Sequence, residues 1–208
     1  MRLSIASLIG FTELAQLKQA TSQSSDHELS QVFKACLRAR DLIKQILTFS
    51  RQAVIRHEPL RLREQLEEIM RLIRATLPAT IEIEQHITID SADLVMADAT
   101  QLHQILMNLC TNAAQAMPDG GRLEIRLEAV RLNDEAMLNL KDLAPGIYYR
   151  LSVSDSGCGM APEVCAKVFE PFFTTKPPGQ GTGMGLAVVH GIVKDMGGAI
   201  SVYSEPDR

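Results

Sequence analysis

Residues 98–117 read DATQLHQILMNLCTNAAQAM, and this stretch predicts a helix with two chemically different faces. Asp98 and Gln101 form a cap pair at its start. The apolar face is made of Leu102, Ile105, Leu106, Leu109, Ala113 and Ala116. The polar face is a stripe of amides: Gln101, Gln104, Asn108, Asn112 and Gln115. No charged side chain occurs from Ala99 to Met117, so this polar face differs from an ordinary solvated helix surface.

The amide stripe indicates the wall of a polar cavity, although a hydrogen-bond ladder between two helices explains the stripe alone equally well. Asn108 and Asn112 are one helical turn apart and therefore point in the same direction. An amide oxygen is a neutral, hard ligand of the kind that Mg²⁺ accepts. The stripe therefore supplies candidate ligand-binding residues.

Residues 147–159 form the second informative stretch. One face of a predicted strand over residues 147–154 carries Ile147, Tyr149, Leu151 and Val153. Asp155 continues this alternation, so we expect its carboxylate to be buried at the mouth of a sheet. Gly157 and Gly159 follow at once, and glycines let a flat ligand approach the backbone. A carboxylate beside such a slot suits the exocyclic amine of adenine, and an Asx-turn that ends the strand is the alternative.

Residues 179–185 read GQGTGMG and lead into a helix predicted over residues 184–196. Free backbone N–H groups and the positive end of the helix dipole make such a loop a phosphate cradle. Neither the P-loop pattern nor the dinucleotide-binding glycine pattern is present. Before this loop, residues 169–178 read FEPFFTTKPP, whose aromatic residues suit the anchor of a mobile lid. Lys176 either reaches phosphate or lies in solvent.

The N-terminal part of the chain predicts a helical hairpin. A first apolar-periodic helix covers residues 3–17, and a second carries a heptad seam of Leu29, Val32, Cys36, Ala39, Ile43 and Ile46. Ser25 and Glu28 form a capping box before the second helix. Two helices cannot bury both apolar stripes alone, so we expect a four-helix bundle in a homodimer. The alternative is that the hairpin packs on the rest of its own chain.

Pro59 ends the helical part, so we place the domain boundary there, with residues 1–57 and 58–208 as the two domains. The second domain alternates helices and strands, which makes the chain an α+β protein. The helices are predicted over residues 60–77, 98–117 and 184–196. The strands are predicted over residues 81–89, 94–96, 123–132, 147–154 and 199–204.

Composition agrees with a globular protein, since the 208 residues are 46% hydrophobic and 22% charged. The net charge of −4 argues against a nucleic-acid partner. No apolar run is long enough for a membrane span, so we expect no membrane contact within this chain. The four cysteines form no CxxC pair and predict reduced thiols in a cytoplasmic protein.

The motifs together resemble those of sensor histidine kinases of two-component systems. Residues 108–113 are similar to the N box of that family, 155–159 to its first glycine box, 169–176 to its F box and 181–185 to its second glycine box. Residues 47–52 are similar to the end of the second dimerisation helix. The resemblance implies the Bergerat ATP-binding fold, a two-layer α/β sandwich with a mixed sheet, behind a dimerisation hairpin.

The resemblance also implies ATP and Mg²⁺ as cofactors. Asn112 matches the Mg²⁺-coordinating asparagine, and Asp155 matches the adenine-binding aspartate. The glycines of the two nucleotide loops are Gly157, Gly159, Gly181, Gly183 and Gly185. The other binding residues within or beside the motifs are Asn108, Gln115, Met160, Phe169, Thr174, Thr175, Lys176, Thr182, Met184 and Leu186. Asn108 stands where hydrolysing relatives carry a glutamate base, so we expect slow ATP hydrolysis.

Two departures from the family pattern are visible. The phosphoacceptor histidine, aligned on Gly10, would fall ahead of Met1, and the last strand and turn of the family would follow Arg208. We therefore expect a fragment of a longer kinase that does not autophosphorylate by itself. The full-length protein would transfer phosphoryl to a histidine and then to a response-regulator receiver domain, whether or not it is membrane-anchored. The alternatives are an ATP-gated dimeric interaction module and a serine kinase of the anti-sigma type.

Overall fold

The structure is a computed structural model that describes residues 5–20, 24–27, 29–33, 36, 57–132, 143–177 and 181–206. The chain divides into two compact units, which are described separately. The first is Met1–Ala53 with Thr174–Thr182, and the second is Val54–Phe173 with Gly183–Arg208.

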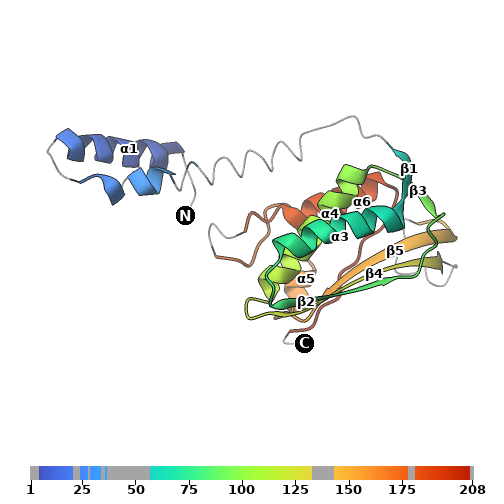
Figure 1. The fold of residues 1–208 in the computed structure, drawn as a ribbon. Coiled ribbons are helices and arrows are strands. Elements are labelled where there is room, and N and C mark those ends of the chain that lie inside the picture. The colour runs from blue at the N-terminus through green and yellow to red at the C-terminus, as the bar shows by residue number, and fades with distance from the viewer. Residues whose placement is uncertain are drawn as a thin grey trace. The chain divides into compact units, whose positions relative to one another are not determined.

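The first unit contains helix α1 (Ile5–Ala20) and a second helical segment that begins after Ser25 (Figure 1). Leu29 N–H donates to Ser25 O at 3.0 Å, which agrees with a helix start at this serine. Four large apolar side chains of this unit are exposed: Leu14, Leu17, Leu29 and Phe33. The heptad positions after Cys36 and the capping residue Glu28 lie outside the described residues, so the full hairpin stays a prediction.

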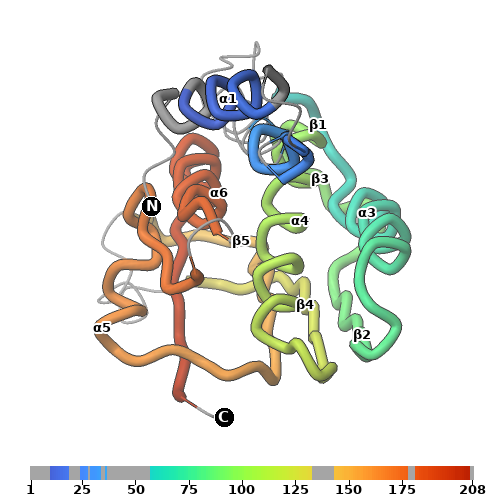
Figure 2. The backbone as a smooth tube through the Cα atoms, turned by 90° about the vertical axis from the view of Figure 1, so that its left-hand side faces the viewer, coloured from blue at the N-terminus to red at the C-terminus, as the bar shows by residue number. Residues whose placement is uncertain are grey.

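The second unit is a two-layer sandwich, as predicted. Its elements are β1 (Glu58–Arg61), α3 (Leu62–Thr76), β2 (Ile81–Ile87), β3 (Leu94–Ala97), α4 (Ala99–Ala116), β4 (Gly121–Leu132), β5 (Gly146–Asp155), α5 (Pro162–Cys165) and α6 (Gly185–Asp195). The main sheet has the order β2-β4-β5, with β2 parallel and β5 antiparallel to β4, so it is mixed. Helices α3, α4 and α6 lie on one side of it, and α4 lies between the other two (Figures 1 and 2).

Alternation along β4 explains why only one face of the sheet is covered. Leu123, Ile125 and Leu127 point into the core and are almost completely buried. The residues between them carry charge, and Arg150 of β5 pairs with Glu128 of β4 at 2.8 Å on the open face. A helix stripe fits such an apolar sheet face, and α4 supplies one with the fully buried Leu106.

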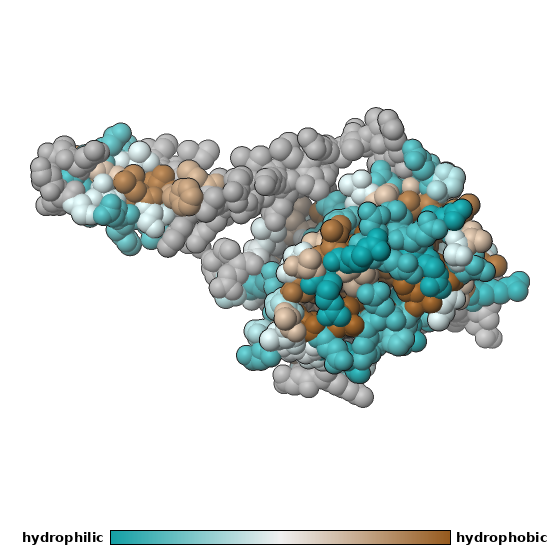
Figure 3. Space-filling model, viewed as in Figure 1, coloured by the Kyte–Doolittle hydropathy of each residue, from teal (hydrophilic) through white to brown (hydrophobic). Residues whose placement is uncertain are grey.

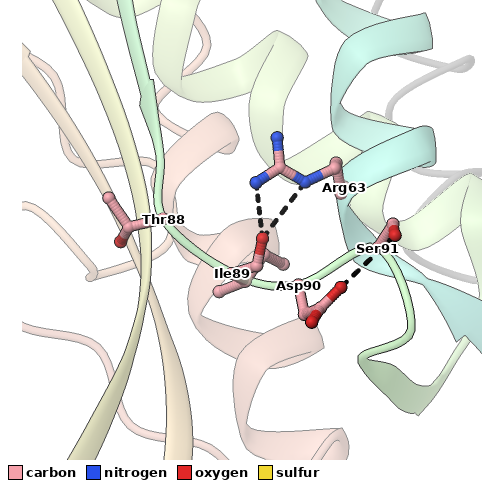
Figure 4. Close-up of a pocket in the computed structure, with 5 residues that line it drawn as sticks. All are labelled: Arg63, Thr88, Ile89, Asp90 and Ser91. Atoms are coloured by element: carbon pink, nitrogen blue, oxygen red, sulfur yellow. Dashed lines mark hydrogen bonds between the residues drawn. The ribbon is translucent and has the colours of Figure 1, made fainter.

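Two arginines of α3 cover the free edge of the sheet. Arg63 donates from Nε and Nη2 to Ile89 O, the Nε bond being 3.1 Å long (Figure 4). Its Nη2 also donates to Ile87 O at 3.1 Å. Arg74 makes longer bonds, of 3.4 and 3.3 Å, to the carbonyl oxygens of Ile81 and Ile83. Because β2 is an edge strand, these bonds satisfy carbonyl groups that would otherwise be open to another chain. The shallow pocket beside Arg63 in Figure 4 contains none of the predicted site residues.

The exposed surface of the second unit carries many charges. Its face in Figure 3 is mostly hydrophilic, with hydrophobic residues in smaller areas between. Within the described part of the chain, no helix has both the length and the apolar character needed to cross a bilayer.

Three predicted elements differ from the structure. Strand β1 was expected to be a linker and the start of a helix, but it pairs antiparallel with β3. Strand β2 ends at Ile87, two residues before the predicted end. The predicted closing strand over residues 199–204 is wrong, because the described residues 199–206 form no strand. The short helix α5 was not predicted.

The packing of α4 makes a prediction about thiol chemistry. Burial raises the pKa of the Cys110 thiol from 9.0 to about 12, so its thiolate fraction at pH 8 falls roughly a thousandfold. Cys158 is exposed. We expect iodoacetamide at pH 8 to label Cys158 at least about a hundredfold faster than Cys110, as measured by peptide mass mapping. Labelling in urea is the control, since unfolding should equalise the rates. Equal rates in the folded chain would contradict this packing.

Candidate functional site

The amide stripe of α4 is oriented by the cap at the start of the helix and by the packing of its buried side. The Asp98 carboxylate caps the start by accepting from Thr100 N–H at 2.7 Å and from Gln101 N–H at 3.4 Å, as predicted from the cap pair. The buried side of the helix packs on the sheet. The stripe is consequently left on the remaining side, where Asn108 and Asn112 are half-buried and Gln115 is exposed.

The start of α6 lies directly against this stripe. A β-carbon at Gly185 would be 3.3 Å from Asn108 Oδ1 and 3.7 Å from Asn112 Nδ2. The N-cap residue of α6 is Met184, which provides no side-chain hydrogen bond to the first turn. The structure therefore brings two amide side chains and the positive end of a helix to one place, an arrangement that attracts anionic oxygen.

The first glycine loop closes on the other end of α4. A β-carbon at Gly157 would lie 2.6 Å from Ala116 Cβ and 2.7 Å from Asp155 Oδ1, so this position has no room for a side chain. Cys158 N–H donates to Ala116 O at 3.2 Å. The loop thus runs against the last turn of α4, and this contact requires glycine at position 157.

Asp155 lies on the predicted face of the sheet, but one expectation about it is wrong. It is opposite the fully buried Leu123 in the strand register, which places both side chains on the helix-covered face. The carboxylate is exposed, however, and accepts from Gly157 N–H at 3.0 Å. The Asx-turn alternative is therefore realised at the end of β5. Ile147 also departs from the expected burial, since it is 73% exposed.

The F box is anchored in the second unit by two contacts. The Phe169 ring lies 5.5 Å from the His190 ring of α6, centroid to centroid. Phe172 N–H donates to Gly183 O at 2.9 Å. Both Phe172 and Gly183 have left-handed backbone angles, with φ of 68° and 67°. A β-carbon at Gly183 would lie 2.4–2.7 Å from backbone atoms of Phe172 and the next residue, so glycine is required there. His190 was not predicted as a site residue.

The remaining candidates of the lid belong to the first unit. Thr174, Lys176 and Gly181 lie together, because a β-carbon at Gly181 would be 2.7 Å from Thr174 Oγ1 and 3.0 Å from Lys176 Cδ. Burial lowers the pKa of the Lys176 ammonium group. Thr175 is exposed and Thr182 is half-buried.

Three further predicted residues lie in the second unit. Met184 is buried, and Met160 and Leu186 are half-buried. Among the described residues, no group of three or more histidine, cysteine, aspartate or glutamate side chains could hold a metal ion. The oxygen donors beside the start of α6 are instead amides, which suit a hard cation that keeps water and phosphate ligands, such as Mg²⁺.

Residues 97–208 match the protein family of histidine kinase-, DNA gyrase B- and HSP90-like ATPases. The chain belongs to this family. The match covers α4 and both glycine loops, so the predicted family resemblance is confirmed.

Known proteins similar to this chain are sensor kinases. The sensor kinase CckA of Brucella abortus (strain 2308) is 36% identical over 204 residues, which are 97% of this chain and 21% of CckA. A full-length ShkA in complex with AMPPNP has a TM-score of 0.62 and 25% identity over 87% of this chain and 36% of that one. The histidine kinase ThkA in complex with the response regulator TrrA has a TM-score of 0.58 and 26% identity, over 80% and 43% of the two chains.

Proposed function

We propose that this chain binds Mg²⁺-ATP and takes part in transferring the γ-phosphoryl group to a histidine and then to a receiver aspartate. The observation that carries the proposal is the close approach of Gly185, at the start of α6, to Asn108 and Asn112. The similarity to ShkA, which was solved with AMPPNP, supports a nucleotide as the ligand. The similarity to ThkA, solved with a response regulator, supports the receiver domain as partner.

Each part of the site has a separate task in this proposal. The Asp155 carboxylate accepts a hydrogen bond from the adenine amine, and the backbone of Gly157 and Gly159 lies beside the ring. Gly183, Gly185 and the start of α6 hold the phosphates. Asn112 is the protein ligand of Mg²⁺, which offsets the negative charge of the phosphates when it is bound.

Asn108 decides between hydrolysis and transfer. A neutral amide cannot take a proton from water at pH 7, whereas a carboxylate at the same place can act as a general base. The site therefore keeps the γ-phosphoryl group for a better nucleophile. In the proposed reaction this nucleophile is a histidine nitrogen, which forms the new N–P bond while ADP leaves.

The adenine assignment predicts the effect of Asp155→Asn. The substitution replaces an acceptor by an amide that can turn an N–H toward the adenine amine, so ATP affinity should fall by about 1–3 kcal/mol. Titration calorimetry with a non-hydrolysable ATP analogue measures the loss. Asp195→Asn, at an exposed carboxylate at the end of α6, is the matched control and should bind like wild type. Equal affinities for the wild type and Asp155→Asn would show that the carboxylate does not bind the adenine amine.

The roles proposed for Asn108 and Asn112 predict a gain of hydrolysis at the first residue and a loss of binding at the second. Asn108→Glu should raise ATP hydrolysis by about tenfold or more, because it supplies the missing general base. Asn112→Ala should remove Mg²⁺-dependent binding. Phosphate release from γ-labelled ATP measures hydrolysis, and calorimetry with and without Mg²⁺ measures binding. An unchanged rate in Asn108→Glu would mean that something other than the base limits hydrolysis.

Free thiols at all four cysteines suit the reducing cytoplasm, where a receiver domain would also lie.

The exposed apolar residues of the first unit favour a homodimer. We expect the chain, of 22.9 kDa, to scatter light as a dimer and Leu29→Asp to scatter as a monomer. Leu29 and Leu94 are equally exposed, at 53%, so Leu94→Asp is the control and should stay dimeric. A wild-type monomer at high concentration would argue against the dimer.

A further inference from the structure

The segment that follows α6 returns to the first glycine loop. Ser204 Oγ accepts from Met160 N–H at 2.9 Å, across 44 residues of sequence. Gly159 has a left-handed φ of 63°, and a β-carbon there would run into the Glu205 carbonyl group and lie 3.1 Å from Pro206 Cα. Residues 204–206 thus form a strap against the second half of this loop.

The first half of the loop is held by a different set of partners. Gly157 N–H donates to the Asp155 carboxylate, and Cys158 N–H donates to Ala116 O of α4. Three of the four backbone N–H groups from Gly157 to Met160 therefore donate to an acceptor within the fold. The acceptors come from β5, α4 and the strap, so the loop is bound on both sides.

Two side chains contact the second half: Ser204 Oγ accepts from Met160 N–H, and Cys165 Sγ donates a long bond of 3.9 Å to Met160 O. Only the Ser204 bond engages the Met160 N–H group. The contacts of Gly159 are to backbone atoms, which no substitution removes. Loss of the hydroxyl would leave Met160 N–H without its acceptor while the covalent structure of the loop stays unchanged. A loop that is not ordered before binding must be ordered by the ligand, and this lowers affinity.

We propose that Ser204 is a positioning residue of the nucleotide site, whose hydroxyl holds Gly159 and Met160 in the arrangement that receives adenine. This inference rests on the proposed ATP-binding function. It gives a functional role to the end of the segment over residues 199–204, which was predicted to be a strand and forms none. The proposal is specific to the hydroxyl group, because only a side chain with a hydrogen-bond acceptor at position 204 can accept from Met160 N–H.

Calorimetry on the full chain tests the proposal. Ser204→Ala should weaken ADP and a non-hydrolysable ATP analogue by the same factor, about threefold to tenfold, as expected for one neutral hydrogen bond. The factor is common to both because they share the adenosine part. Ser201→Ala, at an exposed serine of the same segment, is the matched control and should bind like wild type. In amide hydrogen exchange followed by NMR, the Met160 N–H should exchange faster in Ser204→Ala without nucleotide.

The outcomes separate this inference from the function on which it rests. If the wild-type chain binds neither nucleotide, the proposed function is wrong. If it binds both and Ser204→Ala binds equally well, the positioning role of Ser204 is wrong. The pair Ser204→Thr and Ser204→Val keeps the volume constant and differs in the hydroxyl, so it repeats the test if circular dichroism shows that the alanine variant is unfolded. Thr should bind like wild type, and a Val variant that binds equally well would overturn the proposal.

Discussion

The close approach of two glycine segments to one helix is the constraint on which this architecture depends. A β-carbon at Gly157 would meet Ala116, and one at Gly185 would come within 3.3 Å of Asn108 Oδ1. Helix α4 can accept both segments only because its other side is fixed by the core, where Leu106 is completely buried. One helix therefore serves as a layer of the hydrophobic core and as a wall of the site. The absence of long charged side chains between Ala99 and Met117 follows from this double task, since such chains would fill the space that the loops need.

Elements whose ends are set by local chemistry could be predicted from the sequence. The cap at Asp98 and the glycine stop after α6, where Gly197 has a φ of 71°, place these helix boundaries within about one residue. Strand β1 could not be predicted, because it exists through its pairing with β3 and contains Pro59. The segment over residues 199–204 has apolar residues in alternation, yet Val202 and Tyr203 are exposed and no strand forms there. Pairing with a neighbour decides both cases, and alternation alone does not contain that information.

The position of a candidate residue within its strand or helix could be predicted from the sequence, but its tertiary contacts could not. Alternation along β5 placed Asp155 on the correct face, because parity is a local property of a strand. The exposure of Asp155 depends on which segments cover the end of the sheet, and a local sequence pattern does not contain this information. The ring contact between Phe169 and His190 and the bond between Met160 and Ser204 join segments that are far apart in sequence. Neither serine nor histidine carries a signal in its own neighbourhood for such a partner, so only the fold reveals them.

The two glycine segments differ in how their backbone is restrained, and this difference affects the entropy cost of binding a ligand. The first is bonded to β5, α4 and the strap before any ligand arrives. The second is joined at its base by the hydrogen bond between Phe172 N–H and Gly183 O, and the left-handed φ of Phe172 costs free energy because this residue has a side chain. In the proposed function, a first glycine segment whose backbone is already held lowers the entropy cost of binding adenine. Adenine recognition would thus supply the affinity common to ATP and ADP.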